Sequence, residues 1–247
     1  MNLSETVAKL TIENGMQQSE IIEILIQNPW FSSLPKELAD TLLHKSKIRV
    51  LENKQLLHKK NDQADGFHCV LKGRVRVSNV TLEGKELVLT WILPGTWFGE
   101  ISLVDGLPRT HDAHAEGETT ILKLPNNAFE SMQQQYPGWQ QAIMKLLCQR
   151  VRSTFSLIDE TGCLSLKGQL CKRISLMYKG LQDHQTPTLN TPIELAISQD
   201  SLAQLIHSSR QTVNKILQNL QAENIVTIRY GKLQVLDINL LDKLSQI

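Results

Sequence analysis

Apolar residues change their spacing twice along the chain, and each change marks a different kind of element. In residues 21–45 they recur every three or four positions, which predicts amphipathic helices. From residue 48 to about 124, apolar and polar residues alternate in short runs, as in half-buried β-strands. After Pro125 the helical spacing returns. We therefore expect an α+β protein in which a β-rich region lies between helices.

Glycines divide the β-rich region into short strands. From Gly66 to Gly117 they stand roughly ten residues apart, at expected turn positions, and Gly73 would form one of these turns. Such spacing is expected of an antiparallel jelly roll, also called a double-stranded β-helix. The expected strands are Ile48–Leu51, Phe67–Leu71, Arg74–Val80, Glu86–Leu93 and Thr119–Leu124.

Two helices are expected before the roll. The first has its apolar face within residues 21–26 and should end at the Asn28-Pro29 pair. The second would begin near Ser32 or Ser33, either of which can cap it, with Pro35 in its first turn.

A long helix is expected from Trp139 to about Glu160, because this run has no internal glycine or proline. Thr161-Gly162 would break it at a hinge. Four of its residues lie at the a/d spacing of a two-stranded coiled coil, which predicts a homodimer seam, whereas the alternative is a helix that packs only on the roll. The seam would consist of Leu147, Val151, Thr154 and Ile158.

Composition places the chain among ordinary globular proteins. Its 247 residues are enough for two domains, and its formal charge of +1 gives no overall signal for nucleic acid. It has no apolar run of the length needed to span a membrane and no leader pattern, so we expect a cytosolic protein. The four cysteines form no CxxC pair, which is typical of structural thiols in a reducing compartment. Basic residues nevertheless outnumber acidic ones between residues 207 and 232.

The segment Leu93–Ala115, LPGTWFGEISLVDGLPRTHDAHA, carries chemistry suited to a small anion. Glycines let the backbone approach a ligand closely, and one helical turn after Gly99 would present free N–H groups. The fork of donors on Arg109 suits a phosphate, Thr110 adds a hydroxyl, and Glu100 can accept from sugar hydroxyls. Together these groups predict a site for a ribose that bears a phosphate.

Phe98-Gly99-Glu100-Ile101-Ser102-Leu103, followed by Pro108-Arg109-Thr110, resembles the phosphate-binding cassette of cyclic-nucleotide-binding domains. These domains occur in cyclic-AMP-dependent kinase regulatory subunits and in the catabolite activator/FNR family of bacterial regulators. The resemblance implies that Glu100 binds the ribose and Arg109 the cyclic phosphate, with cyclic AMP as the first expectation and cyclic GMP as the second. The implied binding residues are Gly99, Glu100, Ile101, Ser102, Arg109 and Thr110.

His111, Asp112 and His114 depart from that cassette and raise the question of a metal site. In a strand, only Asp112 and His114 of the three would share a face. We therefore expect no metal here, and instead an effect on the phosphate end of the site.

Residues 197–217 predict a helix-turn-helix. Leu202, Leu205 and Ile206 can face Val213, Ile216 and Leu217, and Ser208 or Ser209 can cap the second helix. His207 would occupy the turn with a positive φ. The exposed side chains are groups that contact phosphates or base edges, and the expected DNA-binding residues are Ser198, Ser209, Arg210, Gln211, Thr212, Asn214 and Lys215.

Ser209-Arg210-Gln211-Thr212-Val213 resembles the start of the recognition helix in the catabolite activator/FNR family. The match implies that Arg210 reads guanine and that Lys215 stands where the activator has a second arginine. Gln211 replaces the usual glutamate, which predicts a different half-site because glutamine pairs best with adenine. Beyond it, residues 225–235 predict a hairpin wing, with Arg229 and Lys232 on DNA phosphates.

These features predict a homodimeric transcription regulator that binds near-palindromic double-stranded DNA, with RNA polymerase as a further implied partner. We expect an N-terminal helical extension (1–30), a cyclic-nucleotide-binding-like roll (31–138), a dimerisation helix and hinge (139–163) and a winged helix-turn-helix (164–247). A regulator of the same fold that needs no nucleotide remains an alternative. A jelly-roll enzyme is more distant, because no catalytic triad or cupin-like metal pattern is visible.

Overall fold

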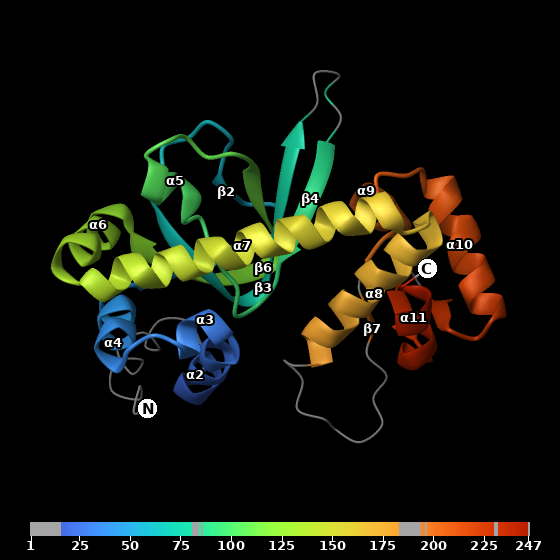
Figure 1. The fold of residues 1–247 in the computed structure, drawn as a ribbon, viewed down its shortest axis with the longest axis horizontal. Helices are drawn as coiled ribbons and strands as arrows, with labels where there is room; N and C mark the ends of the chain where they lie inside the picture. Colours follow the sequence, from blue (N-terminus) through green and yellow to red (C-terminus); the bar gives the residue numbers. More distant parts are fainter. Residues whose placement is uncertain are drawn as a thin grey trace. The chain divides into compact units, whose positions relative to one another are not determined.

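A computed structural model describes residues 16–182 apart from 81–83 and 85, together with 194–195, 197–229 and 232–246 (Figure 1). The chain divides into two compact units. The first consists of residues up to Glu86 and Thr90–Val151, and the second of Leu87–Leu89 and Arg152–Ile247. None of the described helices is long and apolar enough to cross a lipid bilayer.

Three helices precede the roll: α2 (Gln18–Gln27), α3 (Pro29–Ser32) and α4 (Lys36–Lys45). The expected end of the first helix at residue 28 is confirmed, while residues 1–15 of the predicted extension lie outside the described residues.

The expected serine cap is wrong. Asn28 caps α3, because its side chain accepts from the N–H groups of Trp30 and Phe31 at 3.0 and 3.1 Å. Ser33 ends that short helix, and α4 starts after Pro35 without a side-chain cap. Asn28-Pro29 therefore ends one helix and begins the next.

The roll is a six-stranded sheet of β1 (Lys47–Leu51), β2 (Leu56–His58), β3 (Gly66–Val80), β4 (Glu86–Ile92), β5 (Trp97–Phe98) and β6 (Asp112–Pro125). Its path runs β1-β6-β3-β4, with β2 paired to β6 and β5 to β3. The pairs β1–β6, β2–β6, β3–β5 and β3–β6 are antiparallel. The α+β class and the antiparallel roll are thus confirmed.

The expected turn at Gly73 is wrong, because Phe67–Leu71 and Arg74–Val80 belong to one continuous strand, β3. Its register against β6 shifts on either side of Lys72, and Gly73 has φ +75°. A Cβ atom there would lie 2.5 Å from the carbonyl oxygen of Glu118. Glycine therefore forms a bulge that bends the strand without ending it.

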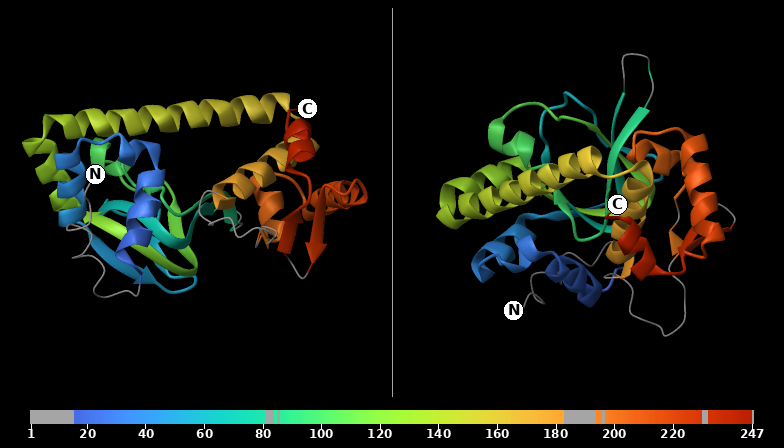
Figure 2. Two further views of the ribbon diagram at one scale, coloured as in Figure 1. Left: turned by 90° about the horizontal axis from the view of Figure 1, so that it is seen from below. Right: turned by 45° about the vertical axis from the view of Figure 1, so that its right-hand side comes forward.

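Alternation along β3 separates two cores. Phe67, Cys69 and Leu71 face a cluster that also contains Trp30 and Trp139, whereas Val70 faces the inside of the roll. Helices from both ends of the first unit thus cover one face of the sheet (Figure 2).

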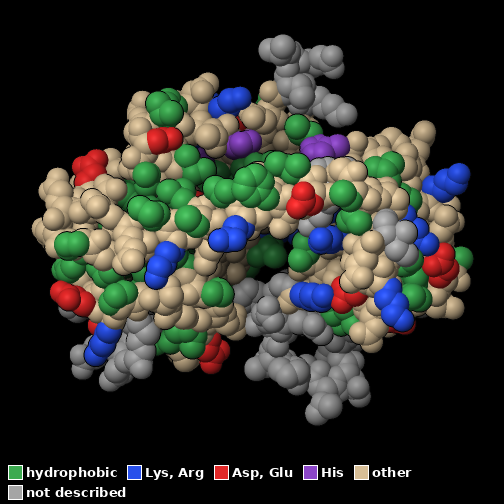
Figure 3. Space-filling view, in the orientation of Figure 1, with side chains coloured by type: hydrophobic (Ala, Val, Ile, Leu, Met, Phe, Trp, Pro, Cys, Tyr) green, Lys and Arg blue, Asp and Glu red, His purple; other side chains and the backbone are tan. Residues whose placement is uncertain are grey.

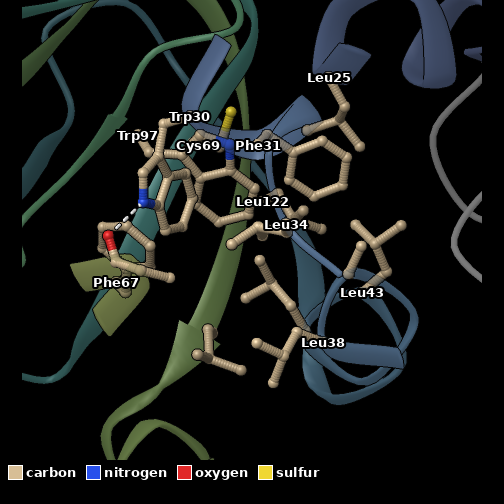
Figure 4. Close-up of a cluster of buried hydrophobic side chains, with 14 of the residues drawn as sticks. Leu25, Trp30, Phe31, Leu34, Leu38, Leu43, Phe67, Cys69, Trp97 and Leu122 are labelled. Atoms are coloured by element: carbon tan, nitrogen blue, oxygen red, sulfur yellow. Dashed lines mark hydrogen bonds between the residues drawn. The ribbon is translucent and has the colours of Figure 1, made fainter. Parts of the chain in front are cut away.

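Trp30 packs within the first of these cores, beside Trp97 and Phe31 (Figure 4). Its ring meets the rings of Phe67, Trp97 and Trp139 edge to face at 5.7, 5.6 and 6.1 Å, and its Nε1 donates to the carbonyl of Ala142 at 2.7 Å. Aromatic burial of this size dominates a core of this kind, and the hydrogen bond satisfies the buried indole N–H. The helices before the roll are therefore part of its hydrophobic core.

Three further helices follow: α5 (Ile101–Asp105), α6 (Asn126–Gln135) and α7 (Pro137–Cys163). The expected break at Thr161-Gly162 is wrong, since α7 continues through both residues. One glycine costs a helix only about 1 kcal/mol relative to alanine, which the rest of a helix this long can absorb.

The apolar stripe on α7 differs from the expected seam. Leu147 packs against the core of the roll, and the exposed residues lie beside it at spacings of four, three, four and three. Figure 3 shows apolar side chains gathered along this helix. The stripe, which we call the α7 stripe, consists of Met144, Cys148, Val151, Phe155 and Ile158.

The second unit contains α8 (Leu166–Gln182), α9 (Gln199–Leu205), α10 (Arg210–Ala222) and α11 (Ile238–Leu244). A small antiparallel sheet, in the order β7-β9-β8, consists of β7 (Glu194–Leu195), β8 (Val226–Arg229) and β9 (Lys232–Val235). The expected hairpin over 225–235 is confirmed, although residues 230–231 at its turn and most of the expected loop 182–192 lie outside the described residues.

Candidate functional site

The segment from β5 to β6 forms a compact loop around α5. Gly99 follows β5 with φ +91°, and the carbonyl of Glu100 accepts the N–H groups of Leu103 and Val104 at 3.1 and 3.0 Å. The helical turn expected here is confirmed. Ser102 donates its hydroxyl to the carbonyl of Pro108 at 3.2 Å, which holds the returning chain against α5. We call residues 99–110 the cassette.

Glu100 is buried, and its carboxylate meets the long helix. Its Oε1 accepts from Nε of Arg150 at 3.2 Å, and Nη2 of the same arginine donates to the carbonyl of Trp97. Arg150 therefore ties α7 to both sides of Gly99. The sequence analysis missed Arg150, because nothing local to an arginine within a helix reveals a partner 50 residues away.

Arg109 is also buried, and its guanidinium is held by the protein. Nη1 donates to the carbonyl of Gly99 at 2.8 Å, and Nη2 donates to the carbonyl of Gly66 at 2.7 Å and to Oδ1 of Asp65 at 3.2 Å. Burial lowers the pKa of Arg109, while the hydrogen bond and charge of Asp65 oppose that change. Nε has no partner. Arg109 thus clamps the cassette to the start of β3.

Asp65 balances the positive charges in this cluster. It pairs with Lys123 as well as with Arg109. Burial alone would raise the pKa of Asp65, but the hydrogen bond from Lys123 and the neighbouring charges hold it below the ordinary value. The sequence analysis missed this residue too, because an acid at the start of a strand is ordinary.

Two histidines lie beside the clamp. The rings of His58 and His68 are 6.3 Å apart, and the ring of His68 lies 5.3 Å from that of Phe98. Burial lowers the pKa of His58 to about 4, with the charge of Arg109 adding to the effect. Burial likewise holds the pKa of His68 well below its ordinary value. Both rings are therefore neutral near pH 7.

The end of the cassette is more open. Thr110 is exposed, and its hydroxyl lies 2.9 Å from Nδ1 of His111. Asp112 accepts from the backbone N–H of Lys60 at 2.7 Å. In β6, Asp112 and His114 lie on one face and the buried Ala113 on the other, as expected from strand alternation. Among the residues that the structure describes, no group of three or more His, Cys, Asp or Glu could hold a metal ion.

The second unit contains the expected pair of short helices. Ser198 caps α9 and Ser209 caps α10, each accepting a backbone N–H at 3.0 Å. His207 has φ +49°, which confirms the turn expected there. The helices share a core of Leu202, Ala203, Ile206, Val213 and Leu217, so the helix-turn-helix geometry is present.

The outer face of α10 carries the expected polar residues. Arg210, Gln211 and Lys215 are exposed, and Thr212 is half-buried. Arg210 lies 3.4 Å from a carboxylate oxygen of Asp200, and both side chains are mostly exposed.

Two other expected DNA-binding residues contact the protein itself. The side-chain oxygen of Asn214 accepts from Gln199 at 3.2 Å. On the wing, Lys232 pairs with Glu194 at 2.7 Å, and Arg229 lies opposite Lys232 in the β8–β9 register.

A β-roll with a cassette, a long helix and a winged helix-turn-helix define a two-domain DNA-binding regulator. Comparison with protein families supports the first and the last of these parts. Residues 48–136 match the cyclic nucleotide-binding domain, and residues 169–244 match the Crp-like helix-turn-helix domain. The chain belongs to the CRP/FNR family of transcription regulators.

Relatives span most of the chain. The cyclic AMP receptor protein of Thermus thermophilus is 26% identical over 88% of this chain and 97% of its own. A CRP-like cAMP-activated global transcriptional regulator of Mycobacterium tuberculosis is 26% identical over 63% of this chain and 69% of its own. The crystal structure of a CRP/FNR-family regulator from Thermus thermophilus, 25% identical, has a TM-score of 0.66 and covers 81% of this chain and 99% of that one.

Proposed function

We propose that the roll binds a cyclic nucleotide, cyclic AMP before cyclic GMP, and that its binding controls DNA binding by the second unit. The contact between buried Glu100 and Arg150 carries this proposal, because it joins the cassette directly to α7. The cyclic nucleotide-binding match and the named cAMP dependence of the Mycobacterium tuberculosis relative also support it.

Different residues of the cassette would bind different groups of the ligand. Glu100 would accept from the ribose, and the backbone from Gly99 to Ser102 would line the phosphate end, with Ile101 at its surface. Arg109 would bind the phosphate with Thr110 beside it. Its Nε, which has no partner, would donate to the phosphate, whereas a second contact from Nη2 requires that nitrogen to exchange its bond to Gly66 or Asp65.

The signal would pass along α7. A ribose hydroxyl on Glu100 competes for the carboxylate that Arg150 now holds, and a change at Arg150 acts on the helix that continues to Cys163. In thermodynamic terms, the nucleotide favours whichever arrangement of α7 it binds more tightly.

The α7 stripe supports the dimer part of the proposal. Its five apolar or small side chains alternate by four and three residues, which is the repeat that a second parallel helix buries. A two-fold dimer would place two copies of α10 in successive major grooves about one DNA turn apart, on a near-palindromic site. RNA polymerase is the further partner expected of such a regulator.

The residues that we propose to contact base edges lie mainly at the start of α10. Arg210 would bind guanine, Gln211 would pair with adenine, and Lys215 would contact a base or phosphate further along. The remaining contacts would go to phosphates, from Ser198, Ser209, Thr212, Asn214, Arg229 and Lys232. Asn214 and Lys232 would first have to release Gln199 and Glu194.

One observation favours the alternative of a regulator without a nucleotide. Both terminal nitrogens of the Arg109 guanidinium already have protein acceptors, so much of its hydrogen-bonding capacity is used within the protein. An enzyme has no comparable support, because the Mycobacterium tuberculosis relative and the CRP/FNR-family structure from Thermus thermophilus are both named transcriptional regulators.

Calorimetry tests the proposal directly. Cyclic AMP and cyclic GMP would be titrated into the full chain, Arg109→Gln and the matched control Arg76→Gln, whose arginine pairs with Glu86 outside the cassette. We expect binding by the wild type and the control, and at least a tenfold loss in Arg109→Gln, about 1.4 kcal/mol. If the wild type binds neither nucleotide, the effector-independent alternative stands.

A further inference from the structure

His68 occupies the inner face of the roll directly beside the cassette. Strand alternation places it on the same side of β3 as Val70, whose cluster includes Phe98 from β5. Its side chain is fully buried, and neither ring nitrogen has a hydrogen-bond partner. A buried imidazole normally forms hydrogen bonds through both nitrogens, so the two nitrogens of His68 are able to bind a further partner.

The ring lies between an acid and the clamp. Nε2 is 4.0 Å from Oδ1 of Asp65, and this oxygen also accepts from Nη2 of Arg109 at 3.2 Å. A Cβ atom on Gly99 would lie 3.4 Å from Nδ1 of His68 and 2.8 Å from Nη1 of Arg109. His68 and Arg109 thus both lie against the open side of Gly99 and both approach Oδ1 of Asp65, to which Arg109 is bound.

The other charges near His68 come from two further strands. His58 lies on β2, and Lys123 lies opposite His68 in the β3–β6 register. Burial is the main reason that the pKa of His68 is lowered; Arg109, His58 and Lys123 also disfavour a proton on the ring, and Asp65 alone of the named neighbours favours one. With Arg109 bound to Asp65, the neutral ring is therefore the stable form.

We propose that His68 couples effector binding to the uptake of one proton. This inference rests on the proposed binding of a nucleotide by the cassette. An anionic phosphate that attracts the guanidinium of Arg109 loosens its bond to Asp65. Oδ1 of Asp65 then has Nε2 of His68 4.0 Å away as a replacement partner, while the other oxygen stays paired with Lys123. The arriving negative charge favours the imidazolium as well. The proton comes from solvent and stays on the ring while the ligand is bound.

Binding should then depend on pH with a defined sign. The pKa of His68 is below its ordinary value without ligand and higher with ligand, so between those two values only the complex carries the proton. Affinity rises as the pH falls through this window, by at most about tenfold per pH unit. Above the pKa of the complex, affinity is independent of pH.

Calorimetry at pH 6.0 in two buffers of different ionisation enthalpy measures this proton. We expect cyclic AMP binding to the wild type to be accompanied by net proton uptake, of at most one proton per site. In His68→Phe, which keeps a ring against Phe98, the uptake should vanish while binding persists. His58→Phe, which removes the neighbouring imidazole, should retain the uptake, and adenosine, which lacks the phosphate, should cause none.

The outcomes separate the two proposals. Binding by the wild type without proton uptake, or equal uptake in His68→Phe, overturns the role of His68 and leaves the nucleotide site intact. Absence of binding to the wild type overturns both. If His68→Phe unfolds at too low a temperature to be tested, the chemical shifts of the imidazole protons of the wild type answer the same question. They would be measured by NMR at pH 6.0 with and without cyclic AMP.

Discussion

Glu100 and Arg150, 50 residues apart in the sequence, form a 3.2 Å ion pair that joins the loop after β5 to the middle of α7. The carboxylate is buried and the guanidinium is partly exposed, so the acid depends on the arginine as its cationic partner. Loss of this pair should therefore lower the stability of the folded state.

Arg150→Gln leaves the buried Glu100 carboxylate without its cationic partner. We expect a loss of about 1–2 kcal/mol in the free energy of unfolding, less than for a fully buried pair because Arg150 is partly solvated. Denaturation in urea measures it. Arg152→Gln, an exposed arginine two residues later, should change stability by less than about 0.5 kcal/mol. Equal effects in both variants would contradict the pairing.

Gly99→Ala should destabilise the first unit by about 2–4 kcal/mol. The backbone is at φ +91°, and the added methyl would meet Nη1 of Arg109 at 2.8 Å. Gly106→Ala is the matched control, since it has φ +72° and no atom within 4 Å of the added Cβ. It should cost only about 1 kcal/mol of backbone strain. The difference between the two variants in thermal or chemical denaturation measures the close approach alone.

The α7 stripe predicts that Cys148 lies opposite its own copy in a parallel dimer. Mild oxidation should therefore yield a covalent dimer on a non-reducing gel, and Cys148→Ser should abolish it. Phe155→Asp should also dissociate the dimer in sedimentation experiments, because it places a charge within the α7 stripe.

Ser153→Asp is the control for the seam, since Ser153 is exposed on α7 but lies off the stripe. It should leave the dimer intact. Dissociation by both aspartate variants would mean that charge on α7, and not the stripe, determines assembly.

Arg210→Ala should weaken binding to the specific DNA site by about 1–3 kcal/mol, with little change on random DNA. Fluorescence anisotropy with a selected site and a scrambled one measures both. Gln218→Ala, at an exposed position further along α10, serves as control. Gln211→Glu should shift the preferred base from adenine toward cytosine in site selection. Equal loss on both DNAs in Arg210→Ala would assign that residue to phosphates.

His58 should make the fold more stable at neutral than at mildly acidic pH. Its pKa is about 4 in the folded state and 6.5 in the unfolded chain, so the unfolded state binds more protons between these values. The contribution of neutral His58 to the free energy of unfolding is fully present above about pH 6.5. It is lost as the pH falls toward 4, and amounts to at most about 3 kcal/mol. Urea denaturation at pH 7, 6 and 5 should show a smaller decline in His58→Gln than in the wild type.

The architecture could be predicted because its signals are local. Alternation predicted the strands, and the α9–α10 turn followed from Ser209 and His207. The two shortest strands of the roll, β2 and β5, have too few residues for alternation to be visible. Gly73 was misjudged because a bulge and a turn require the same positive φ.

The candidate site could be predicted only in part for a similar reason. Glu100 and Arg109 stand within one segment, and their roles toward a nucleotide stay predictions. Their partners Arg150 and Asp65 lie 50 and 44 residues away, and His68 is hidden in an apolar strand. Which distant side chains meet depends on how the sheet folds over itself, and spacing along the chain carries no record of that.

The aromatic cluster around Trp30 has an optical consequence. It holds three of the four tryptophans, with ring centroids of Trp97 and Trp139 at 5.6 and 6.1 Å from that of Trp30. Excitation will pass readily between rings this close, so the native emission comes largely from one place. Trp97 stands two residues before Gly99, so intrinsic fluorescence is a label-free reporter of events at the cassette.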